Sequence, residues 1–335
     1  MGKIKGNLKM KLTKVGFLIS LLMVSISLGT SSTFAIKQYN DSWETRSMLR
    51  TERGWHSIAK YDGKIYIFGG YNYSTGDVNT VEEYNPDRDR CKNVSTMPQN
   101  RTNFCAVTLN KKIYLIGGQG TEQYITDIDV FNPVSKVWSK CASLPVKLAS
   151  SGAAVLNGKI YVAGGNYYDA AADKKTCYNT LYEFNPVKNK WRKRASMLEA
   201  RSGLELVAVN GKLYALGGDN GGPNALKSVE EYDPNSNIWV SKNEMIIPSD
   251  AFAAAVLGSK IYTFGGGQPD SNLPYNYGTV QEYNCRKNKW TQLEDMPISR
   301  YSLDAITLDG EIYVVGGVDS ENFSATKLVE AFNPY

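Results

Sequence analysis

Two carboxylic acids recur at the same position of a repeated segment, and they are the residues that could most directly do chemistry. Glu205 lies four residues after Arg201, and Asp304 lies four residues after Arg300. Two acids held near each other can act as general acid and base, bind a sugar or hold a cation. They could equally bond to backbone edges or to water in a channel. Both interpretations stay open, with Glu205 and Asp304 as the candidates for catalysis.

Metal and cofactor chemistry finds little support in the residue types present. The chain has one histidine, His56, whereas copper and zinc sites usually draw on several His or Cys ligands. A lone histidine on a strand is typical of a hydrogen-bonded scaffold residue. The sequence contains no phosphate loop, nucleophile elbow or metal-spaced Cys/His cluster. We therefore expect neither a metal nor a cofactor.

Four arginines raise the question of an anion clamp. They stand 16 residues before a Gly-Gly pair, at Arg53, Arg101, Arg201 and Arg300. The same four repeats carry an acid further on, at Glu82, Asp129, Glu230 and Glu330. The repeats that lack the arginine also lack the acid. Because stranding one buried charge costs about 3–5 kcal/mol, this joint pattern favours a structural ion pair within each repeat.

The elements that must position these residues come from a repeat of about fifty residues. Six Gly-Gly pairs follow one another at steps of 48, 47, 53, 48 and 51 residues. They are Gly69-Gly70, Gly117-Gly118, Gly164-Gly165, Gly217-Gly218, Gly265-Gly266 and Gly316-Gly317. An apolar run with a tyrosine precedes each pair, often after an Asn-Gly or Asp-Gly turn of the kind that closes two-residue hairpins. A later strand ends at an aromatic residue, and a tryptophan, or Cys91 in the first repeat, follows seven residues on.

Four short strands per unit with these landmarks resemble the kelch motif of β-propellers. The resemblance covers roughly residues 42–335 and implies an all-β, six-bladed kelch-type β-propeller. The last repeat stops after its third strand, at Phe332, and Trp43 stands at the register of the missing fourth strand. We predict that this N-terminal strand completes the C-terminal blade and closes the ring, which removes exposed sheet edges.

Binding is expected on one face of the propeller, because length changes are confined there. The segment between the second and third strands, which we call the b–c loop, varies in length. The aromatic residue that ends the third strand stands 14 to 20 positions after the first glycine of the Gly-Gly pair. Variable loops on a rigid scaffold usually carry binding, and tyrosine offers a stiff apolar face with a polar tip. Alternatively, the tyrosines only roof the loops. The predicted ligand-binding residues are Tyr71, Tyr73, Tyr124, Tyr167, Tyr168, Asp169, Asn220, Tyr275, Tyr277 and Phe323.

Residues 1–35 are predicted to be a secretory signal peptide, and residues 36–335 the propeller domain. Five lysines without any acid precede an apolar stretch from about Val15 to Leu28, which is short for a membrane span. An uncleaved membrane tether is the alternative. Removing five positive charges from a net charge of +5 leaves a neutral chain. A neutral chain argues against a nucleic-acid partner.

Five cysteines give an odd count, so at least one is unpaired or pairs with another molecule. Cys141 and Cys177 are expected on the same face and are the predicted disulfide pair.

The sequence favours a secreted, non-catalytic kelch-repeat protein that binds a protein or a glycan through its b–c loop face. Association with the cell surface is compatible with this interpretation. The alternative is a sugar-acting enzyme that uses Glu205 and Asp304. A sialic-acid epimerase of bacterial periplasms is similar in being a secreted kelch propeller, which implies an epimerase- or mutarotase-like isomerase. That similarity rests on fold and compartment, which do not set function by themselves. A self-associating structural component of the cell surface is a third hypothesis.

Overall fold

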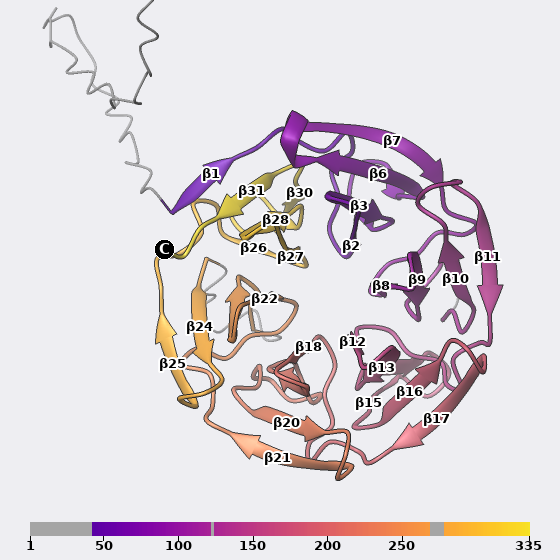
Figure 1. The fold of residues 1–335 in the computed structure, drawn as a ribbon, viewed down its shortest axis with the longest axis vertical. Helices are drawn as coiled ribbons and strands as arrows, with labels where there is room; N and C mark the ends of the chain where they lie inside the picture. The colour runs from indigo at the N-terminus through magenta and orange to yellow at the C-terminus, as the bar shows by residue number, and fades with distance from the viewer. Residues whose placement is uncertain (1–41, 122–123, 269–277) are drawn as a thin grey trace, which may run out of the picture. The chain divides into compact units, whose positions relative to one another are not determined.

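Six four-stranded antiparallel sheets, arranged as blades around a common axis, form most of the part of the chain that the structure describes (Figure 1). The computed structural model describes residues 42–121, 124–268 and 278–335, which belong to one unit, Tyr39–Tyr335. The all-β, six-bladed architecture predicted from the Gly-Gly period is confirmed. Within the described residues, no helix has the length and apolar character needed to cross a membrane.

The strands of a blade are called a, b, c and d from the axis outward. In blades one to three they are β2 (Ser57–Tyr61), β3 (Lys64–Phe68), β6 (Thr80–Asn85), β7 (Arg90–Thr96), β8 (Cys105–Leu109), β9 (Lys112–Ile116), β10 (Ile128–Phe131), β11 (Trp138–Cys141), β12 (Gly152–Leu156), β13 (Lys159–Ala163), β16 (Leu181–Asn185) and β17 (Lys190–Arg194). In blades four to six they are β18 (Glu205–Val209), β19 (Lys212–Leu216), β20 (Val229–Asp233), β21 (Ile238–Lys242), β22 (Ala253–Leu257), β23 (Lys260–Phe264), β24 (Val280–Asn284), β25 (Lys289–Gln292), β27 (Asp304–Leu308), β28 (Glu311–Val315), β31 (Val329–Phe332) and β1 (Trp43–Thr45).

The sixth blade takes its outermost strand from the other end of the described chain. β1 pairs antiparallel with β31, so that Trp43 lies opposite Phe332 with ring centroids 4.7 Å apart. The backbone N–H of Asn333 also donates to the carbonyl of Ser42 at 2.9 Å. A strand-d tryptophan opposite a strand-c aromatic recurs in other blades, for example Trp138 opposite Phe131. Trp43 therefore occupies the strand-d position that its register predicted.

The Gly-Gly pairs fasten each blade to the next one. Gly69 and Gly70 have φ angles of 60° and 96°, and a Cβ on Gly69 would lie 2.6 Å from the carbonyl oxygen of Arg101. Only glycine combines a left-handed φ with so close an approach. The N–H of Gly70 donates to that same carbonyl at 2.9 Å. The sequence period thus reflects a contact between blades, not only a turn within one.

The b–c loops add short elements of their own on one side of the blades. These are β4 (Tyr71–Asn72), β5 (Gly76–Asp77), β14 (Asn166–Asp169), β15 (Lys174–Cys177), β29 (Val318–Asp319) and β30 (Ser324–Ala325). β26 (Arg300–Tyr301), in the d-to-a connection that leads into blade six, pairs with β29. A 3-10 turn, η1 (Pro86–Arg88), follows β6 at a c–d connection. Two-residue turns close the a–b hairpins, as at Asn157-Gly158, where φ is 51° and 69°. The elaborated face is therefore the one where the sequence varies in length.

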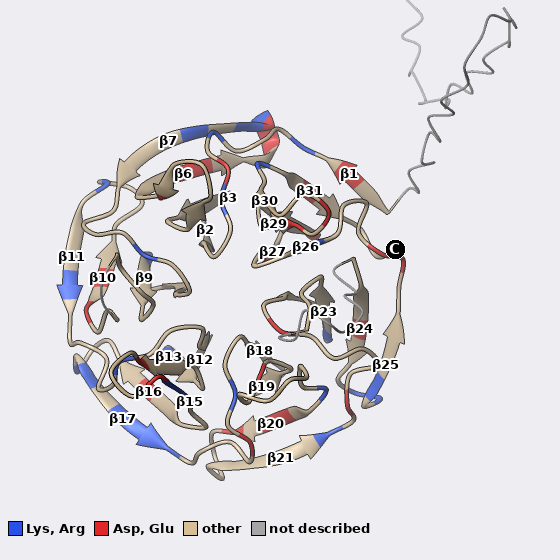
Figure 2. Ribbon diagram, turned by 180° about the vertical axis from the view of Figure 1, so that it is seen from behind, with Lys and Arg blue, Asp and Glu red and all other residues tan. Residues whose placement is uncertain are grey.

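The outermost strands carry many basic side chains. Figure 2 shows Lys and Arg on these strands, above all on β17, whose sequence is Lys-Trp-Arg-Lys-Arg. Charged side chains on an outer strand discourage edge-to-edge pairing with another sheet.

The predicted pairing of Cys141 with Cys177 is wrong, because all five cysteines are free. Cys141 ends β11 on the outside of blade two and packs against the cluster that contains Leu144 and Leu148. Cys177 ends β15 in the b–c loop of blade three, where its sulfur lies 3.6 Å from the hydroxyl of Ser202. The expectation considered the face of the propeller but not the distance from its axis.

Candidate functional site

The four arginines are buried inside blades and do not form a ligand site. Each has no exposed surface. Their carboxylate partners are Glu82, Asp129, Glu230 and Glu330. The nitrogen–oxygen distance is 2.5 Å between Arg101 and Asp129. The structural pairing predicted from the repeats is confirmed.

A ring of backbone hydrogen bonds surrounds the axis on the b–c loop face. We call it the collar. It consists of Trp55, Asn103, Ser150, Gly203, Ala251 and Ser302, one residue from each blade. The N–H of each collar residue donates to the carbonyl of the collar residue in the preceding blade, over 2.7 to 3.3 Å, and Trp55 donates to Ser302. All six residues have φ between 50° and 62°. This shared left-handed conformation turns the chain into strand a at the axis.

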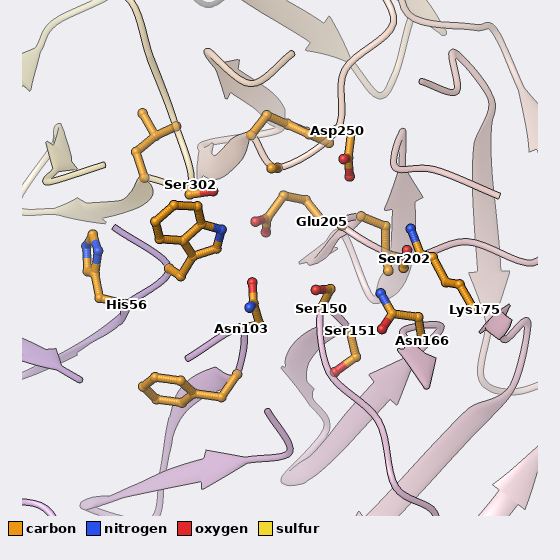
Figure 3. A pocket seen from close by; sticks show the side chains of 17 residues that line it. His56, Asn103, Ser150, Ser151, Asn166, Lys175, Ser202, Glu205, Asp250 and Ser302 are labelled. Carbon is orange, nitrogen blue, oxygen red and sulfur yellow. The ribbon is translucent and has the colours of Figure 1, made fainter. Parts of the chain in front are cut away.

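The collar encloses a cavity of about 210 Å³, which we call the mouth cavity. All six collar residues line it, together with Glu205, Asp250 and Lys175. Figure 3 shows Glu205, Asn103 and Ser150 pointing toward one another across this space. Convergent polar groups in a concave site are typical of ligand recognition.

Glu205 and Asp304 both line a second cavity of about 390 Å³ that continues along the innermost strands, so the predicted placement near the axis is correct. Their bonding differs. Asp304 accepts hydrogen bonds from the N–H of Ile58 at 2.8 Å and the hydroxyl of Ser57 at 3.2 Å. Glu205, which lines both cavities, accepts no hydrogen bond from any described residue. Asp304 thus joins blade six to blade one, and Glu205 retains a free carboxyl group.

Enclosure changes the protonation of both acids. Burial raises the pKa of Asp304 to about 6, against the opposing effect of its hydrogen bonds. Burial and the nearby charge of Asp304 raise the pKa of Glu205 well above its usual range. Both residues keep part of their surface accessible, because they face the channel while protein surrounds them.

Asp250 is a second acid in the mouth cavity, beside Glu205, and the sequence argument missed it. Burial and the charge of Asp219 raise its pKa to about 7, although Lys175 opposes this shift. The Lys175 ammonium forms its ion pair with Asp219, which is 2% exposed. Lys175 is thus engaged by another carboxylate, and Asp250 has no ion-pair partner among the described residues.

His56 is a buried residue in the wall of the mouth cavity, and neither ring nitrogen forms a hydrogen bond with a described residue, unlike the hydrogen-bonded scaffold residue that the sequence favoured. It is 6% exposed. Burial and the charges of Arg53 and Arg300 lower its pKa to about 3, so the imidazole is neutral at physiological pH. Within the described ranges, no three His, Cys, Asp or Glu side chains lie together as a metal site would require.

The predicted loop tyrosines form two clusters. Tyr71 and Tyr73 contact Trp55, with ring centroids 6.3 and 5.7 Å away. Tyr124 contacts Tyr167 at 4.9 Å, and its hydroxyl accepts the N–H of Tyr168 at 2.9 Å.

The second cluster lines a groove of about 490 Å³, the tyrosine groove. The Tyr124 hydroxyl donates to Asn166, a residue of the mouth cavity, over 3.5 Å. The tyrosine groove therefore adjoins the mouth cavity.

The remaining predicted binding residues have varied positions. The carboxylate of Asp169 accepts the N–H of Ala171 at 3.0 Å and stabilises its own turn. The Asn220 amide donates to Glu199 at 3.2 Å. Phe323 is 61% exposed. Tyr275 and Tyr277 lie outside the described residues.

Several mouth residues had a signal in the sequence that was not used. Collar residues stand two positions after the arginine register, and Asp250 stands one position after it. At the Asp250 register the other blades carry Gly54, Thr102, Ala149, Ser202 and Tyr301. Asp250 is thus the one acid at its register, as Glu205 and Asp304 are the acids at theirs.

Comparison with known proteins shows which families and structures this chain resembles. The sequence matches the family described as the KLHDC2/KLHL20/DRC7 Kelch-repeats domain over residues 30–218 and 153–333. Kelch-like protein 25 of Xenopus tropicalis is 31% identical over 261 residues, which cover 76% of this chain and 42% of that protein. Kelch-like protein 36 of Bos taurus is 24% identical over 313 residues, with coverage of 91% and 42%.

The chain therefore spans less than half the length of these curated relatives. A solved structure entitled "Structure of YjhT" superposes with a TM-score of 0.72 at 16% identity, covering 84% of this chain and 95% of the other. That likeness supports the fold alone. Six Gly-Gly repeats, six blades and these matches together establish that the chain belongs to the kelch-repeat family.

Proposed function

We propose that this chain is a secreted binding module that takes a protein partner on its b–c loop face. The observation that carries the proposal is that the mouth cavity and the tyrosine groove adjoin each other, through the contact between Asn166 and Tyr124. Kelch-repeat domains generally bind proteins, and the family match extends that expectation to this chain.

Exposed aromatic side chains on this face support a protein partner. Tyr73 is 52% exposed, Tyr168 is 44% exposed and Phe323 is 61% exposed. Tyrosine and phenylalanine are enriched in protein interfaces, where a few of them supply most of the binding energy. They surround a polar centre, so the face combines apolar anchors with hydrogen-bonding groups.

Secretion is supported by the lysine-rich head and apolar stretch of residues 1–35. These residues lie outside the described part of the chain. N-terminal sequencing of the protein recovered from the culture medium tests this part of the proposal. A start near residue 36 is expected, whereas retention of residues 1–35 in the cell would contradict it.

Site-specific photo-crosslinking tests the binding face. The photoreactive residue benzoylphenylalanine replaces Tyr73 or Tyr168, and a control position is Val134, which is 71% exposed in the c–d turn of blade two, on the other face. We expect both loop-face positions to crosslink the same partner and Val134 to crosslink none. Crosslinking from Val134 alone would place the partner on the other face and overturn the proposal.

A glycan is the second candidate ligand, because the tyrosine groove combines Tyr167 and Tyr168 with the polar side chains of Thr102 and Gln119. Sugars bind by stacking on aromatic rings and by hydrogen bonds. Glycan-array binding that is lost in the Tyr167→Ala/Tyr168→Ala variant would favour this candidate. A sugar-acting enzyme retains support from the free carboxyl group of Glu205, but not from Asp304, which is bound to the backbone of blade one.

A further inference from the structure

The mouth cavity contains more acid than cation. Glu205 and Asp250 both line it, and neither carboxyl group forms an ion pair with a described residue. The ammonium that reaches the cavity, that of Lys175, is paired with Asp219. The four arginines nearest the axis are committed to partners within their blades. The cavity therefore lacks the positive charge that would balance its two acids.

Trp55 is an independent sign of a ligand at the same place. The other collar positions hold Asn, Ser, Gly, Ala and Ser, whereas Trp55 places a bulky indole at a φ of 53°. Such a residue is strained in the left-handed region. Its ring is half-buried and lines the mouth cavity. An aromatic face beside two carboxyl groups is the chemistry that holds a cation.

Ser302 adds an unpartnered polar group to the cavity wall. It is 7% exposed, and its hydroxyl finds no hydrogen-bond partner among the described residues. Figure 3 shows Ser302 on the wall, across from Asn103 and Ser150. A ligand with several N–H donors would find oxygen acceptors from different blades around this space.

The size of the cavity limits what can enter it. Its volume of about 210 Å³ lies below the roughly 300–1,000 Å³ typical of sites that bury a drug-sized ligand. It is the size of one long side chain. An inserted side chain of a partner protein therefore fits better than a whole small molecule.

We propose that the mouth cavity binds one cationic side chain of the partner protein, a lysine ammonium or an arginine guanidinium, between Trp55 and the carboxylates of Glu205 and Asp250. This inference rests on the proposed function, because it identifies the chemical group that the loop face recognises.

Affinity should then depend on pH. The pKa of Asp250 is about 7 and that of Glu205 is raised, and a bound cation favours the ionised form of both. The other charged groups that face them are Asp219, Lys175 and Asp304. The neutral groups are His56 and the thiols of Cys105 and Cys177, whose pKa values are raised by burial. Raising the pH from 5 to 8 removes protons from the acids, and we expect binding to strengthen at least tenfold.

Selection of random peptides displayed on phage, on the purified protein at pH 8, tests the inference. We expect enriched peptides to share a Lys or Arg, and the synthetic peptide with norleucine at that position to bind at least tenfold more weakly. The Glu205→Gln/Asp250→Asn variant should lose this binding. Asp233→Asn, which removes an acid at a c–d turn, is the matched control and should retain it.

A second variant separates recognition from folding. Trp55→Asn copies the collar residue of blade two, which adopts the same φ, so the collar should persist and cation binding should fall. Enriched peptides without a basic residue, or equal binding by the double variant, would overturn the cation site and leave the loop-face function standing. Failure to enrich any peptide on a cooperatively melting protein would also overturn the cation site. Crosslinking at Tyr73 and Tyr168 decides the proposed function separately.

Discussion

Blade four holds two glutamates whose surroundings are opposite. Glu230, on strand c, is 2% exposed and bonds to Arg201 at 2.7 Å and to the N–H of Leu198 at 2.7 Å. Glu205, on strand a, bonds to no described residue. A buried charge with every partner in place stabilises the scaffold. A buried charge without a partner lowers stability, and its presence points to a role in binding or catalysis. The difference distinguishes scaffold from site within one sheet.

The largest expected effect comes from breaking the satisfied pair. Arg201→Met leaves the Glu230 carboxylate buried and unpaired, and we expect a loss of about 3–5 kcal/mol in the free energy of unfolding. Urea denaturation followed by tryptophan fluorescence measures it. Adding Glu230→Leu should recover much of the loss. Two losses that simply add would show that the residues do not act as a pair.

Removing the two acids that have no ion-pair partner among the described residues should have the opposite sign. The pKa values of Glu205 and Asp250 are raised in the folded state, so their contribution to stability is present below the unfolded pKa and is lost as the pH rises through the folded pKa. Glu205→Gln/Asp250→Asn should therefore stabilise the protein by about 1–3 kcal/mol at pH 8 and change little at pH 4. Thermal melts at both pH values check this. Destabilisation at pH 8 would mean that the acids have structural partners.

The smallest effect is expected at Glu183, a buried acid on strand c of blade three whose partner Lys159 is partly exposed to solvent. Burial alone would raise the pKa of Glu183, but hydrogen bonds from Lys159 and Tyr161 outweigh it and lower the pKa. Its stabilising effect is present above the unfolded pKa and is lost as the pH falls through the folded pKa. Lys159→Met should cost about 0.5–1 kcal/mol at pH 7 and move the acid-unfolding midpoint to higher pH. An unchanged midpoint would show that Lys159 does not lower the pKa of Glu183.

Features that depend on side-chain identity at fixed spacing could be predicted from the sequence. The joint presence of Arg201 and Glu230 indicated their ion pair, and the register of Trp43 indicated its place beside Phe332. The ion pair shows as two residues that are present together or absent together across the repeats, and Trp43 shows as a tryptophan at a recurring register. Comparison of the repeats was therefore enough to find both.

The collar positions keep a constant register to the arginines, but their conformation could not be predicted from residue types, because the collar hydrogen bonds use backbone atoms alone. Trp55, Gly203 and Ala251 share no side-chain property, yet they share one conformation. The mouth cavity follows from that conformation. Likewise, the sequence grouped Glu205 with Asp304 by register, but whether a carboxyl group reaches a neighbouring N–H depends on its side-chain length and on the spacing between blades.

The collar separates the architecture of the mouth from its chemistry. Its six bonds join N–H and carbonyl groups, so the frame itself does not require a particular side chain. Residues as different as Trp55 and Ala251 adopt nearly the same φ in it, whereas Gly203 must stay glycine because a Cβ there would collide with Oδ1 of Asp250. Single substitutions at the other collar positions can therefore change the recognised ligand while the frame stays the same. Related chains could thus acquire new specificities stepwise at the axis, without passing through an unfolded intermediate.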